Sequence, residues 1–189
     1  MPPRVIVDND ADLALVVRCR NGDWSAYTEL VLRYRRPIYN AAFWVLRKAE
    51  DANDVTQDVF LKVAERLDEY DSRYKFFSWI YRIAVNESLN LLRRNGREEE
   101  LDGEIELPDG TSASPESLGG DAEGSSRIRA ALMSMSTNDR TVLMLRHFSE
   151  CSYREIGEIL GLDEKTVKSR LFDARQRLAH LLKDLRGLT

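Results

Sequence analysis

The sequence predicts an all-α protein made of two small helical domains joined by an acidic, flexible linker. Apolar residues recur at spacings of three and four through both ends of the chain, and no segment shows the alternation expected of a strand. In residues 97–125, Gly, Ser, Pro and acids replace large apolar side chains. Such a segment cannot bury enough apolar surface to offset the entropy lost on ordering. We therefore place the domains at residues 10–95 and 126–186 and the linker at 96–125.

The first two helices of the N-terminal domain are indicated by capping residues. Asp10 or Asp12 caps the first helix, which ends at about Arg20 before an Asn-Gly turn. The second begins near Ser25. It is expected to be interrupted near Pro37, because proline cannot donate the helical hydrogen bond.

A third helix, expected at about residues 51–67, carries a cluster of acids. Asp51, Asp54 and Asp58 recur at spacings of three and four, with Gln57 beside them. Like charges this close repel by about a few tenths of a kcal/mol per pair, which a basic protein partner would offset. A plain solvated face is the alternative. A metal site is not expected, because no histidine or fourth acid joins the cluster.

The fourth helix, at about residues 76–92, and the loop before it combine aromatic and cationic side chains. Such combinations are typical of proteins that stack unpaired bases and hold single nucleic-acid strands. Burial in a helical core is the preferred interpretation for Trp79, Ile80, Ile83 and Ala84. Four aromatic residues are expected in the loop at the helix start, where a place in the core is less automatic: Tyr70, Tyr74, Phe76 and Phe77.

The C-terminal domain is expected to contain helices at about residues 126–135, 138–147, 153–160 and 164–185. The last two have the pattern of a helix-turn-helix motif. Ser152 followed by Glu155 is a capping-box pattern, Gly161 supplies the left-handed turn residue, and Asp163 caps the next helix.

The second helix of this motif has two faces. Its apolar residues recur at spacings of 4, 3, 4 and 3: Val167, Leu171, Ala174, Leu178 and Leu181. The opposite face carries Lys165, Lys168, Ser169, Phe172 and Gln176, with Asp173 at its edge. Lys can reach guanine or phosphate, Ser a phosphate and Phe a thymine methyl group. A solvated face with one stray aromatic is the alternative.

The net charge of −4 is distributed unevenly along the chain. Residues 1–96 carry a net charge of +1, residues 97–125 carry −9, and residues 126–189 carry +4. The ends of the chain can therefore meet a polyanion although the whole sequence is acidic.

Composition argues against several other classes. The two cysteines lie far apart without a CxxC motif, and the two histidines are too few for most metal sites, so neither disulfide, metal nor cofactor is expected. No apolar run is long enough to span a membrane, and the N-terminus lacks the features of a signal peptide. A cytoplasmic location is expected.

Taken together, these stretches resemble the extracytoplasmic-function sigma factors of the bacterial sigma-70 family. The resemblance rests on DVTQDVF, FSWIYRIAVN and SYREIGEILG…TVKSRL, in that order and separated by an acidic linker. It covers nearly the whole chain, with residues 10–95 similar to sigma region 2 and 126–186 to region 4. It implies a non-catalytic initiation subunit that binds the clamp and flap regions of core RNA polymerase. It also implies recognition of −10 and −35 promoter elements as duplex and single-stranded DNA.

The resemblance also assigns residues to each contact. Polymerase binding falls to Asp51, Asp54, Gln57 and Asp58. Melting and recognition of the −10 element fall to Tyr70, Lys75, Phe76, Phe77, Trp79, Arg82, Asn86 and Asn90, with Asn86 near a pocket for an extruded base. Recognition of the −35 element falls to Lys165, Lys168, Ser169, Phe172, Asp173 and Gln176. Three residues are expected to contact phosphates there: Arg146, Tyr153 and Arg170. The acidic linker is expected to pass toward the polymerase active-site channel.

Two departures from the family pattern stand out. Asn53 replaces an acid in the polymerase-binding motif, and Asp173 replaces an arginine. Asp173 can accept a hydrogen bond from a cytosine amino group or pair with Arg170 or Arg177 along the helix; we favour the salt bridge.

Alternatives from other classes explain less of the chain. A helix-turn-helix regulator with an N-terminal interaction domain explains residues 140–185 equally well but explains FFSWIYRIAVN poorly. An enzyme has no assembled nucleophile, base or cofactor loop in its favour. An anti-sigma factor is left open as a further partner.

Overall fold

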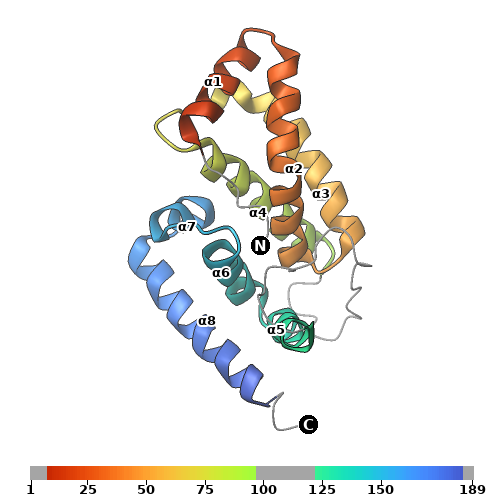
Figure 1. Cartoon of the computed structure of the whole chain (residues 1–189), viewed down its shortest axis with the longest axis vertical. Coiled ribbons are helices and arrows are strands. Elements are labelled where there is room, and N and C mark those ends of the chain that lie inside the picture. The colour runs from red at the N-terminus through yellow and green to blue at the C-terminus, as the bar shows by residue number, and fades with distance from the viewer. Residues whose placement is uncertain (1–7, 97–121, 185–189) are drawn as a thin grey trace.

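The computed structural model describes residues 8–96 and 122–184, and every regular element in this part of the chain is helical (Figure 1). The N-terminal half comprises α1 (Asn9–Arg20), α2 (Trp24–Leu46), α3 (Ala49–Arg66), the 3-10 turn η1 (Leu67–Glu69) and α4 (Phe76–Arg94). The C-terminal half comprises α5 (Ala122–Ser134), α6 (Thr137–His147), α7 (Tyr153–Leu160) and α8 (Glu164–Asp184). The predicted all-α class is confirmed. Within the described ranges, no helix combines the length and apolar character needed to cross a bilayer.

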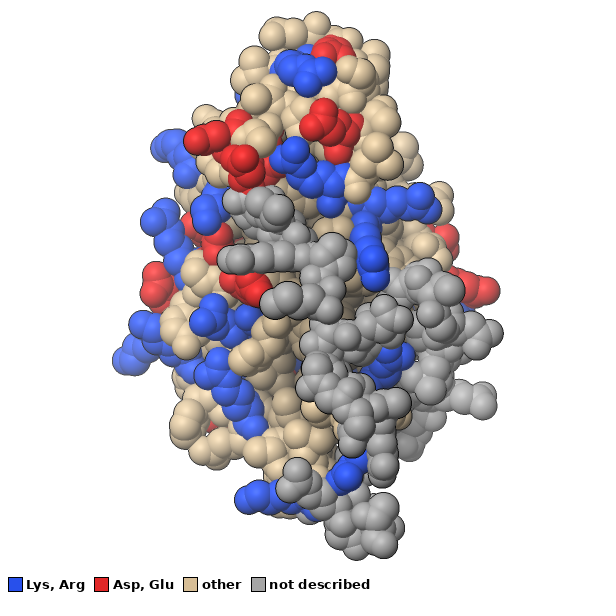
Figure 2. Space-filling model, viewed as in Figure 1, with Lys and Arg blue, Asp and Glu red and all other residues tan. Residues whose placement is uncertain are grey.

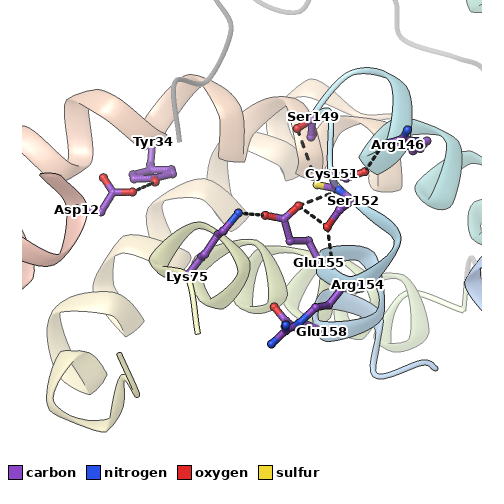
Figure 3. A network of polar contacts seen from close by, with 10 residues as sticks. All are labelled: Asp12, Tyr34, Lys75, Arg146, Ser149, Cys151, Ser152, Arg154, Glu155 and Glu158. Carbon is purple, nitrogen blue, oxygen red and sulfur yellow. Dashed lines mark hydrogen bonds and ion pairs between the residues drawn. The ribbon is translucent and has the colours of Figure 1, made fainter. Parts of the chain in front are cut away.

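Helix α1 is capped by neither of the two expected residues. The Asp8 side chain accepts a hydrogen bond from the Ala11 backbone N–H and caps the helix instead. Asp12 is fully buried, and its carboxylate accepts a hydrogen bond from the Tyr34 hydroxyl on α2 (Figure 3). Arg33, on the same helix, donates to the other carboxylate oxygen. Burial raises the pKa of Asp12, and these hydrogen bonds oppose the rise. The acid therefore anchors α1 to α2.

The expected interruption of the second helix at Pro37 is wrong, because α2 continues through the proline to Leu46. Proline removes one helical hydrogen bond. Tyr34 and Ile38, on either side of it, are fully buried, and their packing offsets the loss. The burial of residues on both sides of Pro37 thus outweighs the helix-breaking tendency of proline.

Most of the predicted linker, residues 97–121, lies outside the described part of the chain. Helix α5 begins at Ala122, inside the stretch assigned to the linker and ahead of the expected start at Ser126. Ala and Glu at the first two positions favour a helix. The change in composition at the end of the acidic segment therefore places the start of this helix a few residues too late.

The two halves pack directly against each other, α4 against α7 and α2 against α6 (Figure 1). The rings of Trp44 on α2 and Phe148 after α6 lie 5.2 Å apart between centroids. Nearby, the Ser149 hydroxyl lies 3.4 Å from the hydroxyl of Tyr81 on α4. One continuous apolar core therefore runs through both halves.

Arg140 on α6 lies at the centre of this contact with 1% of its surface exposed. Its guanidinium donates to the carbonyl oxygens of Trp44 and Val45 at the end of α2, and to that of Met135 after α5. Desolvation lowers the pKa of Arg140 to about 9, so the side chain stays cationic at neutral pH. Partial negative charge at the helix ends compensates this buried cation.

Replacing Arg140 by lysine is expected to lower the free energy of unfolding by about 2 kcal/mol. Lysine keeps the charge but cannot donate to all of these carbonyls at once, and it leaves buried acceptors unpaired. Urea unfolding measures the loss. The exposed Arg94→Lys is the control and should change stability by less than about 0.5 kcal/mol. Equal effects in the two variants would contradict a structural role for the Arg140 hydrogen bonds.

Candidate nucleic-acid interface

Helices α7 and α8 form the predicted helix-turn-helix, and its local signals are confirmed. Ser152 and Glu155 make a complete capping box, and Gly161 has φ +66° after the last residue of α7. A Cβ atom on Gly157 would stand 2.5 Å from the Leu162 carbonyl oxygen, so only glycine permits this close turn. The Asp163 carboxylate accepts from the Thr166 backbone N–H at 2.8 Å and caps α8.

Helix α8 presents its predicted polar face to solvent. Val167, Leu171 and Ala174 are buried, and α8 packs against α5, α6 and α7. The opposite side chains are exposed: Lys165, Lys168, Ser169, Phe172, Asp173 and Gln176. Phe172 is 60% exposed, so it has no packing role in this structure. In Figure 2, Lys and Arg side chains recur along the outer edge of the molecule over α8.

The expected pairing of Asp173 along the helix is wrong. Arg177 donates two hydrogen bonds to the carboxylate of Asp139 on α6, at 2.7 and 2.6 Å. Within the described part of the chain, neither Arg170 nor Arg177 forms an ion pair with Asp173. The side chain of Asp139 is only 13% exposed. A largely buried carboxylate attracts the arginine more strongly than the exposed carboxylate of Asp173 does.

The aromatic cluster at the start of α4 lies inside the domain rather than on a loop surface. Phe76 and Phe77 are the first two residues of α4, and both are buried, as is Tyr70. The rings of Tyr70 and Phe76 pack at 5.5 Å between centroids, and Trp79 packs against both. The expected position of Phe76 and Phe77 in a loop before the helix is wrong, because both belong to the buried first turn of α4. Tyr70 does lie in the loop, but its side chain is buried. In this conformation the buried rings support the exposed face of α4 from beneath, and they do not stack on a nucleic-acid base.

Arg20 holds this turn in place, and its role was not predicted. Its guanidinium donates to the carbonyl oxygens of Leu67 and Tyr70, each at 2.7 Å. The Tyr70 hydroxyl donates to the Tyr74 carbonyl oxygen at 2.6 Å. No sequence pattern indicates that a cation near the end of α1 fastens a turn about 50 residues away.

The exposed face of α4 carries three polar side chains. Arg82, Asn86 and Asn90 recur every four residues, share one face and are exposed. Trp79 is partly buried and Tyr74 is 48% exposed. A cavity of about 700 Å³ opens between this end of α4 and the turn between α7 and α8. Its wall includes Tyr74, Trp79, Arg82 and Arg154.

Lys75 connects this region to the helix-turn-helix. Its ammonium lies 2.6 Å from a carboxylate oxygen of Glu155, the residue that also completes the α7 capping box (Figure 3). Burial alone would raise the pKa of Glu155, but hydrogen bonds donated by Lys75 and Ser152 outweigh it and hold that pKa below its ordinary value of 4.5. One carboxylate therefore serves both a helix terminus and the contact between the two halves.

The acidic residues of α3 lie on the outer surface of the N-terminal half. Asp54, Gln57 and Asp58 are exposed, together with Asn53. Asp51 is partly buried and lies 3.9 Å from the Lys48 ammonium. Leu61 follows the acids at 63% exposure, so the exposed side of α3 joins carboxylates to an apolar side chain.

The depressed pKa of Glu155 predicts a pH-dependent contribution to stability. The folded state holds the carboxylate below its unfolded pKa, so this contribution is present above about pH 4.5 and is lost as pH falls through the lower folded-state pKa. Glu155→Gln keeps a capping-box residue but removes the charge. It is expected to lose about 1 kcal/mol at pH 7 and less at pH 3, measured by urea unfolding. A loss that does not change with pH would contradict the ion pair's contribution.

Comparisons with known proteins agree with this geometry. The model of Sigma-70 region 2 matches residues 30–98, and that of Sigma-70 region 4 matches residues 125–178. The chain is 30% identical to the ECF RNA polymerase sigma factor SigW of Bacillus subtilis, over 90% of this chain and 96% of SigW. It is 30% identical to the ECF RNA polymerase sigma-E factor of Escherichia coli K12, over 92% of this chain and 95% of that protein.

Two solved structures of complexes have a similar fold. CnrH, in complex with the cytosolic domain of CnrY, has a TM-score of 0.69 and 27% identity, covering 92% of this chain and 98% of CnrH. RpoE, in complex with the anti-sigma factor NepR from Bartonella quintana, has a TM-score of 0.65 and 26% identity. That match covers 83% of this chain and 96% of RpoE.

Proposed function

The chain belongs to the extracytoplasmic-function group of the sigma-70 family, and we propose that its two halves divide polymerase binding and promoter recognition between them. Members of this family partner with core RNA polymerase and promoter DNA and give transcription initiation its promoter specificity. We propose that the protein acts in the cytoplasm and is not itself catalytic, since the polymerase performs the synthesis. The exposed α8 face with its solvent-facing Phe172 carries the residue-level assignment.

Helix α8 reads the −35 element in duplex DNA. Lys168, Ser169 and Phe172 reach base edges in the major groove, where an apolar ring suits a thymine methyl group. The N-terminal end of α8 approaches the bases as the second helix of such motifs does. Lys165, Asp173 and Gln176 extend the same surface. Arg146, Tyr153 and Arg170 flank it on the side of the DNA backbone.

Helix α4 recognises the −10 element as its strands separate. Melting costs about a few kcal/mol, which is recovered when an extruded base is hydrogen-bonded in a protein pocket. Asn86 offers both a donor and an acceptor on the exposed face, between Arg82 and Asn90. Tyr70, Phe76 and Phe77 act from beneath as support, with Trp79 at the rim and Lys75 released from Glu155 for DNA.

Helix α3 binds core polymerase through its exposed acids. Asp54 and Asp58 face solvent and offer carboxylates to a basic element such as the polymerase clamp, and the exposed amide of Gln57 lies beside them. Asp51, partly engaged by Lys48, lies at the end of this surface. We assign the C-terminal half to the flap region of the polymerase, and the acidic segment before α5 to a path toward the polymerase active-site channel.

An anti-sigma factor is a further candidate partner. The structures of CnrH and RpoE are complexes with CnrY and with the anti-sigma factor NepR. By analogy, a regulatory protein that keeps the two halves together would withhold this chain from polymerase.

The purified protein is expected to co-migrate with core polymerase and to support runoff transcription from promoters selected out of a random library. Phe172→Ala is expected to weaken use of the best promoter by about 1–3 kcal/mol, or roughly 5- to 150-fold, because the base contact is lost while the core is untouched. The exposed Trp24→Ala is the matched control and should transcribe as the parent does. Tight binding of duplex DNA alone, without polymerase, would contradict the sigma-factor assignment.

Asn86→Ala is expected to slow open-complex formation about tenfold while polymerase binding stays intact. The side chain is exposed, so the substitution removes a base contact and leaves the fold in place. Fluorescence of a labelled −10 element reports melting, and gel filtration reports holoenzyme assembly. Asn95→Ala, just past the end of α4, is the matched control. Loss of assembly in Asn86→Ala would identify Asn86 as structural.

A further inference from the structure

The ring of Tyr153 lies beside two cations from different helices. Tyr153 is the first residue of α7. The guanidinium carbon of Arg146, on α6, lies 5.2 Å from the ring centroid, and the ammonium of Lys168, on α8, lies 5.6 Å from it. Both distances fall within the range of cation–π attraction. The ring thus joins three helices at the edge of the proposed DNA-binding surface.

Each of the two cations has a second contact that fixes its direction. Arg146 donates to the Cys151 carbonyl oxygen at 2.8 Å (Figure 3). Lys168 lies 3.9 Å from the carboxylate of Glu164, one helical turn earlier on α8. The ammonium of Lys168 is therefore held between a carboxylate on its own helix and an aromatic ring on the neighbouring one.

This arrangement restricts a long and flexible side chain. Lysine carries a point charge on a flexible four-carbon stem, and its 58% exposed side chain would sample many rotamers. An exposed cation–π contact favours one arrangement by about two- to fivefold. The ring, together with the Glu164 carboxylate, offsets the repulsion between Arg146 and Lys168. A lysine that is already aimed loses less freedom when it binds a base edge.

We propose that Tyr153 is a positioning residue for −35 recognition, and that its ring aims the Lys168 ammonium at the base pair which that lysine reads. This replaces the expectation that Tyr153 contacts a phosphate through its hydroxyl. The inference rests on the proposed role of α8 in −35 recognition. It makes the aromatic ring, and not the hydroxyl, the functional group of this residue.

The test separates ring from hydroxyl. Reconstituted holoenzyme carrying Tyr153→Phe, Tyr153→Leu or Lys168→Met is presented with promoters randomised across the −35 element, and base preference is read from the transcripts. Tyr153→Phe is expected to keep the parent's preference. Tyr153→Leu is expected to lose about two- to fivefold of the preference at one base pair, the same pair that Lys168→Met affects.

A double-mutant cycle gives the decisive comparison. In the Lys168→Met background, Tyr153→Leu should cause no further loss of preference, because its effect passes through the lysine. In the Gln176→Ala background its effect should remain complete. Tyr153→Met is a second variant without a ring, in case the leucine variant does not fold, and thermal unfolding checks each protein.

Two results would overturn the inference and leave −35 recognition by α8 in place. One is equal loss in Tyr153→Phe and Tyr153→Leu, with the salt dependence of binding reduced by about one phosphate contact. The other is a change of preference in Lys168→Met but none in any Tyr153 variant. If Lys168→Met itself leaves base preference unchanged, the −35 assignment of this face is wrong and the inference falls with it.

Discussion

Arg140 lies where the end of α2, the end of α5 and the start of α6 meet, and its guanidinium donates to neutral oxygen atoms. A cation removed from water is costly unless it is compensated. Carbonyl groups at helix C-termini carry partial negative charge, and the planar fork of arginine reaches several of them at once. This geometry exists only when α6 is seated against α2. The position of the helix-turn-helix relative to the N-terminal half follows from it.

The packing of the two halves against each other also decides which of the proposed DNA-binding residues are accessible. Helix α4 turns its inner face to α7, and Lys75 is held by Glu155. Asn86 and Asn90 stay exposed, and so does the whole polar face of α8. The proposed −35 surface is therefore accessible in the packed arrangement, whereas part of the proposed −10 surface is engaged within the molecule. A DNA phosphate that binds Lys75 would therefore compete with the carboxylate of Glu155, which also completes the capping box of α7.

How far the sequence predicts this structure depends on how local each signal is. The capping box at Ser152, the turn at Gly161 and the two faces of α8 lie within a few residues, and all were predicted. Arg140 and Asp12 act across 96 and 22 residues, and no spacing in the sequence indicates their partners. The burial of Tyr70 was missed for the same reason, because a loop that packs onto a core has the same composition as an exposed loop.

Asp173 shows how a long-range contact changes the interpretation of a local pattern. Its spacing from Arg177 allows a helical ion pair, but Asp139 on α6 occupies that arginine. Asp173 therefore stands exposed beside Phe172 on the reading face, and no described side chain neutralises it. A carboxylate there repels phosphate and accepts a hydrogen bond from a cytosine amino group. The exposed carboxylate thus fits the proposed discrimination among −35 sequences better than it fits a role in stabilising α8.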